Sequence, residues 1–138
     1  APPTGALALI VLLDQFTRNI HRGTPAAFAG DAQALTLALQ LVHSGEHLRL
    51  PPLQRWFAYL PLEHAEDLTL QQQCVRLFEA LAAEEGPHRE VLAGALDYAR
   101  RHHDVIARFG RFPHRNAILG RASTAEEATF LLQPGSSF

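Results

Sequence analysis

The spacing of apolar residues constrains this chain more than any other feature, because it follows a helical period from end to end. No segment alternates apolar and polar residues with β-branched enrichment, so the sequence predicts no β-sheet. Paired helical segments joined by short links favour stacked helical hairpins over a four-helix bundle. The pattern therefore predicts an all-α fold of antiparallel helical hairpins, in a single domain that spans residues 1–138.

Capping residues, glycines and prolines set the bounds of the expected helices. The first five helices are expected at residues 5–22, 31–43, 53–60, 62–84 or 67–84, and 87–109. Asp31 is expected as the N-cap of the second helix, and Pro61 either ends the third helix or starts the fourth. A last helix follows Ser123 and Thr124, each of which precedes a glutamate by three positions, and stops at Pro134.

The first expected helix has an apolar face and a polar face. At about 100° per residue, its apolar face consists of Leu9, Leu12, Leu13, Phe16 and Ile20. We expect apolar faces of this kind to account for packing. Without a partner, this face would favour self-association, so a homo-oligomer is one expectation.

Composition limits the partners that the chain can have. The net charge of −2 gives no field that would attract nucleic acid or an anionic membrane. The apolar run at residues 6–13 is too short to span a bilayer. No phosphate-binding loop and no nucleophile-elbow motif is present, so the sequence indicates no cofactor.

Two residue counts bear on the compartment and on the extent of the chain. Cys74 is the one cysteine, so no internal disulfide can form, which fits a reducing compartment, and we expect a cytoplasmic protein. The chain contains no methionine, which suggests that an upstream segment is missing.

The first polar cluster lies on the polar face of the first expected helix. Asp14 and Arg18 are spaced for an ion pair, whereas Arg18 and Arg22 place like charges one turn apart. A bound anion or an acidic neighbour would relieve that repulsion. The alternative is a solvated helix face. The cluster consists of Asp14, Gln15, Arg18, Asn19 and Arg22.

The second polar cluster follows Pro61. If this segment is helical, Glu63, His64, Asp67 and Gln71 lie within an arc of about 100°. A carboxylate beside a histidine suits acid–base catalysis, so the candidate catalytic pair is His64 with Glu63 or Asp67. The alternative is a first helical turn enriched in acidic residues, which complement the helix dipole. The cluster consists of Glu63, His64, Glu66, Asp67 and Gln71.

The third polar cluster lies on a backbone broken by Gly110 and Pro113. Its arginine forks and backbone donors suit an anionic group. The alternative is a structural connection whose arginines bond the carbonyls of neighbouring helix ends. The candidate ligand-binding residues in it are Arg111, His114, Arg115 and Asn116, flanked by His102, His103 and Arg121.

Sequence spacing indicates no metal site. His43 and His47 have helical spacing, but Gly45 interrupts the turn between them, and Gly86-Pro87 likewise interrupts the spacing of Glu85 and His88. The adjacent His102 and His103 point to different sides of a helix. A metal ion held across the fold by His64, His103 and His114 stays open as an alternative.

Three ordered motifs in this chain resemble the bacterial domain-of-unknown-function family 924. They are residues 13–23 (LDQFTRNIHRG) with Asp31, residues 59–67 (YLPLEHAED), and residues 108–116 (RFGRFPHRN) with the LGR at 119–121. The resemblance implies an all-α, tetratricopeptide-like fold and a helical segment upstream of residue 1. It brings no established activity.

Three functional hypotheses follow, and they leave open whether the protein is an enzyme. The first is a pocket that binds a small anionic ligand or acts on it, formed where the three polar clusters meet. The second is a module that takes up a protein or peptide partner in a groove lined by Trp56, Phe57 and Tyr59. The third is a purely structural network in which the polar clusters bond only one another.

Overall fold

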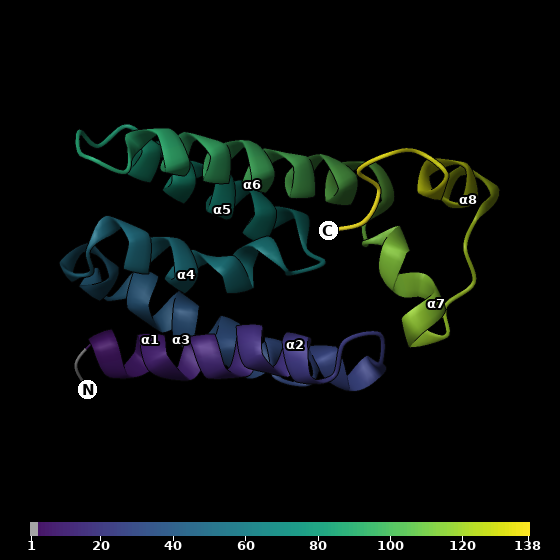
Figure 1. Ribbon diagram of the computed structural model, residues 1–138, viewed down its shortest axis with the longest axis horizontal. Coiled ribbons are helices and arrows are strands. Elements are labelled where there is room, and N and C mark those ends of the chain that lie inside the picture. The colour runs from purple at the N-terminus through teal and green to yellow at the C-terminus, as the bar shows by residue number, and fades with distance from the viewer. Residues whose placement is uncertain (1–2) are drawn as a thin grey trace.

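The described part of the chain folds into helices alone, in a computed structural model that describes residues 3–138 (Figure 1). The all-α prediction is confirmed. The longer helices are α1 (Pro3–Val11), α3 (Asp31–His43), α4 (Pro52–Glu63), α5 (Leu68–Ala82) and α6 (Arg89–Phe109). The shorter ones are α2 (Thr17–Ile20), α7 (Asn116–Leu119) and α8 (Ala125–Leu131). Within residues 3–138, no helix has the length and apolar character needed to cross a membrane.

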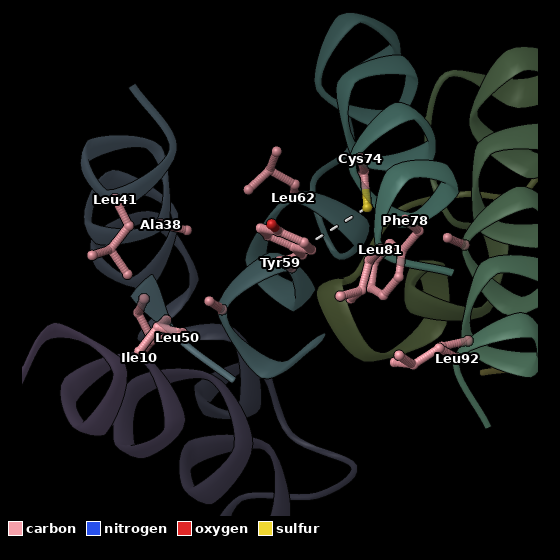
Figure 2. Packing of buried hydrophobic residues seen from close by; sticks show 13 residues of the cluster. Ile10, Ala38, Leu41, Leu50, Tyr59, Leu62, Cys74, Phe78, Leu81 and Leu92 are labelled. Carbon is pink, nitrogen blue, oxygen red and sulfur yellow. Dashed lines mark hydrogen bonds between the residues drawn. The ribbon is translucent and has the colours of Figure 1, made fainter. Parts of the chain in front are cut away.

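The helices form layers, with α4 between the pair α1 and α3 on one side and the pair α5 and α6 on the other (Figure 1). The short connection at residues 83–88 folds α6 back on α5 as a helical hairpin. Buried side chains from five of these helices meet between the layers, among them Ile10, Leu41, Leu62, Phe78 and Leu92 (Figure 2). The helices α7 and α8 lie at one end of this stack (Figure 1).

The predicted bounds agree with the structure at α3 and fail around Pro61. Helix α4 continues through Pro61 to Glu63, which is tolerable because a proline in the last turn removes only one backbone hydrogen bond. Gln71 ties the end of α4 to α5, since its Nε2 donates to the carbonyls of Glu63 at 2.6 Å and Ala65 at 2.8 Å. The second polar cluster therefore spans a helix end and the next helix start, and the prediction that it shares one helical arc is wrong.

Capping was predicted correctly at one of two helix starts. Thr124 and Glu127 form a reciprocal capping box at α8. Asp31 was expected as the N-cap of α3, but Gly30 occupies that position and Asp31 is the first helical residue. This change leaves the Asp31 carboxylate available to a partner outside its own helix.

The apolar face predicted for the first helix points away from the core. Four of its side chains are largely exposed, with Ile20 at 72% exposed. Ile10 and Asp14 are buried instead, each with only 1% of its surface exposed. The chain stays helical through a π-helical segment, η1 (Leu12–Phe16), which joins α1 to α2. The expectation that this apolar face accounts for packing is wrong, because α1 also has apolar residues on the side of Ile10, and those pack into the core.

Candidate functional site

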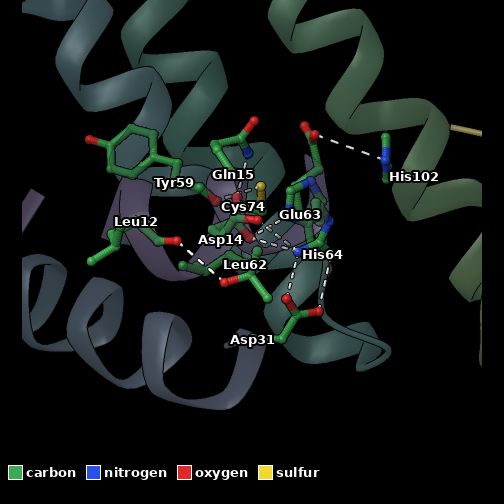
Figure 3. Close-up of polar contacts among 12 residues, drawn as sticks. Leu12, Asp14, Gln15, Asp31, Tyr59, Leu62, Glu63, His64, Cys74 and His102 are labelled. Carbon is green, nitrogen blue, oxygen red and sulfur yellow. Dashed lines mark hydrogen bonds and ion pairs between the residues drawn. The ribbon is translucent and has the colours of Figure 1, made fainter. Parts of the chain in front are cut away.

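The first and second polar clusters meet at the buried carboxylate of Asp14 (Figure 3). Asp14 lies in η1, and π-helical turns occur frequently at functional sites. His64 Nδ1 lies 2.7 Å from Asp14 Oδ1, and Arg18 Nη1 donates to the same oxygen at 3.1 Å. Gln15 Nε2 donates to the other oxygen at 2.5 Å. Three donors from two helical segments thus satisfy this carboxylate.

The contact with Asp14 fixes the proton position on His64. Burial raises the pKa of Asp14, but the hydrogen bond from His64 and the charge of Arg18 outweigh it, so the pKa lies below its ordinary value. Burial lowers the pKa of His64, against the opposing effect of Asp14. An ionised Asp14 accepts only from a protonated Nδ1, which leaves Nε2 as a free acceptor on a neutral imidazole. His64 borders a cavity, so its imidazole lies beside any ligand that binds there.

Arg115, one of the arginines of the third polar cluster, is buried and forms no ion pair among residues 3–138, although the charges of Glu66 and Asp31 act on it. Its Nη2 donates to the carbonyl of His64 at 2.9 Å, and its Nε has no hydrogen-bond partner within the described chain. The guanidinium lies 4.5 Å from the ring centroid of Phe28 and 4.7 Å from that of Phe112. Burial, followed by the charge of Arg18, lowers the pKa of Arg115 to about 10, so the group stays charged at neutral pH.

The neighbouring Arg18 differs from Arg115 because its charge is compensated. It forms a forked pair with Asp31, with Nη1 donating at 2.5 Å and Nη2 at 3.0 Å, in addition to its bond with Asp14. Asp31 is the acidic neighbour that relieves the repulsion between Arg18 and Arg22. Sequence reasoning missed this role, because Asp31 matched the pattern of a helix cap.

Arg18, His64 and Arg115 line a cavity of about 580 Å³. No acidic side chain lines it among the described residues. Its polar lining includes Gln15, Arg18, Asn19, Arg22, His64 and Arg115. Its aromatic lining consists of Phe28, Tyr98, His102, Phe112, His114 and Phe138. Cations and rings without carboxylates favour an anionic occupant with apolar surface.

Glu63 and Asp67 do not pair with His64. Asp67 Oδ1 caps α5 by accepting from the Leu70 N–H at 2.9 Å. Glu63 is buried, and its Oε2 lies 3.9 Å from His102 Nε2 while its Oε1 has no partner within residues 3–138 (Figure 3). Burial and the charge of Asp14 raise the pKa of Glu63 to about 8. The carboxylate partner of His64 is Asp14, which the sequence assigned to a different cluster.

Part of the third polar cluster lies outside the cavity and holds the chain together. Arg111 forms a forked pair with Glu127, with Nε donating at 2.9 Å and Nη2 at 2.7 Å. Asn116 Nδ2 donates to Ser123 Oγ at 3.0 Å. For these two residues, the structural interpretation of the connection fits better than the ligand-binding one. Their partners are mainly side chains rather than the helix-end carbonyls expected from the sequence.

Glu66 fastens the same connection to the end of α4. Its carboxylate accepts two bonds from Arg121, at 2.8 and 3.0 Å, and one from the backbone N–H of Phe112 at 2.6 Å. These bonds hold residues 112–121 against the segment that carries His64, which places His114 and Arg115 beside the cavity.

Metal ligation and three aromatic positions complete the comparison with the sequence. Within residues 3–138, no group of three or more histidine, cysteine or acidic side chains is arranged to hold a metal ion. Tyr98, Phe112 and Phe138 line the cavity, although no sequence pattern selected them as lining residues. Helical spacing alone does not distinguish an aromatic residue of a core from one that lines a cavity.

Comparisons with known proteins agree with this fold and leave the activity open. No curated protein matches the chain. A solved structure of a protein of unknown function from Agrobacterium tumefaciens is similar to it at 40% sequence identity, with a TM-score of 0.81. The similarity covers 94% of this chain and 68% of that one. A family model described as a bacterial protein of unknown function, DUF924, matches residues 1–135. The chain therefore belongs to this family, as its three motifs predicted.

Proposed function

We propose that the protein binds a small organic anion in the cavity and that Arg115 is its principal cation. The observation that carries this proposal is the buried guanidinium of Arg115, which lines the cavity and forms no ion pair with a carboxylate within residues 3–138. A buried charge is costly unless it is paired. A carboxylate or phosphate group that accepts from Arg115 removes this cost, and Arg22 adds a second cation on the cavity wall.

The pair of Asp14 and His64 gives the same cavity a group for acid–base chemistry. His64 Nε2 takes a proton from the bound anion or from a water molecule, and Asp14 stabilises the imidazolium that forms. A neutral histidine with a free Nε2 is in the protonation state that a general base requires. Asn19, which accepts a hydrogen bond from Arg22 at 3.0 Å, helps to orient that cation.

Two alternatives have weaker support. A purely structural network requires every member to be satisfied, whereas Arg115 Nε and His114 Nδ1 have no partner in the described chain. A peptide groove lined by aromatic residues requires Tyr59 to be accessible, whereas it is 2% exposed and packs edge-on against Phe78 in the core.

Anion binding is tested by following amide chemical shifts and the melting temperature as acetate or phosphate replaces chloride at constant ionic strength. We expect both to change in the wild type and both changes to shrink in Arg115→Met. Because Arg115 is buried, Arg22→Met provides a second variant whose exposed position leaves folding intact.

Arg100→Met is the matched control. Arg100 is half-exposed and pairs with Glu79 away from the cavity, so its loss should leave the anion response unchanged. A wild type that does not respond to either anion overturns the proposal. An equal loss of response in Arg100→Met and Arg22→Met also overturns it, because that result indicates nonspecific screening.

A further inference from the structure

The aromatic part of the cavity wall forms a connected surface of rings. The imidazole of His102 stacks on Phe138, with centroids 3.7 Å apart and planes inclined by 25°. The Tyr98 ring centroid lies 4.8 Å from that of His102, and the Phe112 centroid lies 5.5 Å from it. Four rings from three separate parts of the chain therefore meet at His102.

This ring surface begins at the cation that the anion would contact. Phe112 touches His102 on one side and the guanidinium of Arg115 on the other, at 4.7 Å. Phe28 lies against the same guanidinium at 4.5 Å. A ligand whose charged group reaches Arg115 therefore has aromatic surface immediately beside that group.

The two histidines in the ring surface are neutral at physiological pH. His102 Nδ1 lies 2.9 Å from the carbonyl of Tyr98, to which it donates its proton. Burial lowers the pKa of His102 to about 3 and that of His114 to about 4. His102 and Phe112 are almost fully buried, at 3% and 0% exposed, so they support the two rings that a ligand can reach, Tyr98 and Phe138. Uncharged ring faces and edges attract other rings in offset or edge-to-face arrangements.

The volume of the cavity also exceeds what a bare anion fills. At about 580 Å³ it falls in the range of sites that enclose organic ligands. An inorganic anion bound at Arg115 would leave water against the ring surface, whereas an apolar body displaces that water.

We propose that the ligand is an aromatic anion, a flat ring with a carboxylate or phosphate attached, and that the ring packs against the accessible rings of Tyr98 and Phe138. This inference rests on the proposed anion-binding function and specifies the ligand class for that same cavity.

Three carboxylates of equal charge test the inference: phenylacetate, cyclohexylacetate and acetate, each titrated into the full chain with amide chemical shifts as the readout. We expect phenylacetate to bind about tenfold or more tightly than acetate, as burial and ring contacts favour it. Cyclohexylacetate, which is apolar but not flat, should fall between them. Phenyl phosphate in place of phenylacetate distinguishes a phosphate from a carboxylate head group.

Ring variants separate this inference from the function on which it rests. Phe138→Leu and Tyr98→Leu, the latter at a half-exposed side chain, should weaken the binding of phenylacetate and leave the binding of acetate unchanged. Arg22→Met should weaken the binding of both carboxylates. Equal binding of the three carboxylates, or cyclohexylacetate binding as tightly as phenylacetate, overturns the aromatic ligand class and leaves anion binding in place. Binding of none of the carboxylates overturns the proposed function itself.

Discussion

His64 Nδ1 and Asp14 Oδ1 lie 2.7 Å apart although fifty positions of sequence separate the two residues. The contact joins the π-helical segment η1 to the C-terminal end of α4 at the edge of the cavity. It also assigns the proton of His64 to Nδ1, and so makes Nε2 the atom that can act on a ligand.

Replacing Asp14 with Asn tests the buried carboxylate. We expect Asp14→Asn to lower the free energy of unfolding at neutral pH by about 1.5–3 kcal/mol, because His64 and Arg18 lose a charged acceptor. The folded-state pKa of Asp14 is lowered, so its stabilisation is present above the unfolded pKa and is lost as the pH falls through the folded pKa. The difference between variant and wild type, measured by urea unfolding, should therefore shrink in acid. Asp104→Asn, at a side chain that is 78% exposed, is the control and should leave the free energy of unfolding unchanged. Equal stability of the two variants would contradict a stabilising role of the Asp14 carboxylate.

Glu63→Gln should stabilise the protein, and more so as the pH rises. The pKa of Glu63 is raised from 4.5 to about 8 by burial and by Asp14. Between these values the unfolded chain ionises Glu63 while the folded chain keeps it protonated, so the wild type loses stability with rising pH. The free energy of unfolding of Glu63→Gln should exceed that of the wild type by on the order of 3 kcal/mol near pH 7. Melting temperatures from pH 4.5 to 8 measure this, and a gain independent of pH would sink the prediction.

His114 should destabilise the protein in acid. Burial, followed by the charge of Arg115, lowers its pKa from 6.5 to about 4. As the pH falls from 6.5 toward 4, the unfolded chain binds a proton that the folded chain refuses, so stability is lost. The free energy of unfolding should therefore fall less steeply with decreasing pH in His114→Gln, by up to about 1.4 kcal/mol per pH unit. His21→Gln, at an exposed turn position, is a control that should leave this dependence on pH unchanged. An unchanged dependence in His114→Gln would show that other groups cause the loss of stability in acid.

Glu66→Ala should loosen the connection at residues 112–121. The carboxylate loses its forked pair with Arg121 and its bond from the Phe112 N–H, which we expect to cost roughly 2–3 kcal/mol. Glu126→Ala removes a pair with Arg108 in which both side chains are about half exposed or more, so it should cost at most about 0.5 kcal/mol. Hydrogen exchange should speed up at Phe112 in the first variant only. Equal exchange rates in both variants would show that Glu66 does not fasten the connection.

Gly30→Ala should disturb the packing of η1 against α3. A Cβ at Gly30 would lie 2.2 Å from the backbone oxygen of Leu13, next to Asp14, so one of the two segments must move. Such overpacking costs about 1–3 kcal/mol. Gly94→Ala, inside α6 with open space around it, should instead stabilise by roughly 0.5–1 kcal/mol. Chemical denaturation of both variants checks the opposite signs, and a neutral Gly30→Ala would show that this contact relaxes freely.

The sequence by itself determined the helical class, the bounds of α3 and the capping box at Thr124. These features depend on residues within a few positions of one another, and local spacing and hydrogen bonding specify them. The sequence also selected most of the polar residues that line the cavity, because arginine, histidine and asparagine on helix faces and broken connections are conspicuous.

Only the tertiary structure decided which face of the first helix turns inward and which residues pair. Residues 3–16 carry apolar side chains on both sides, so periodicity does not choose between them; the burial of Ile10 and the partners of Asp14 do. The pairing of His64 with Asp14 rather than with Glu63 or Asp67 depends on where separate helices end in space. The same holds for the pairing of Arg18 with Asp31 and of Arg111 with Glu127. Charge neutralisation between distant residues has no local pattern. Only the folded chain therefore shows that Arg115 is buried beside the cavity with no carboxylate paired to it within residues 3–138.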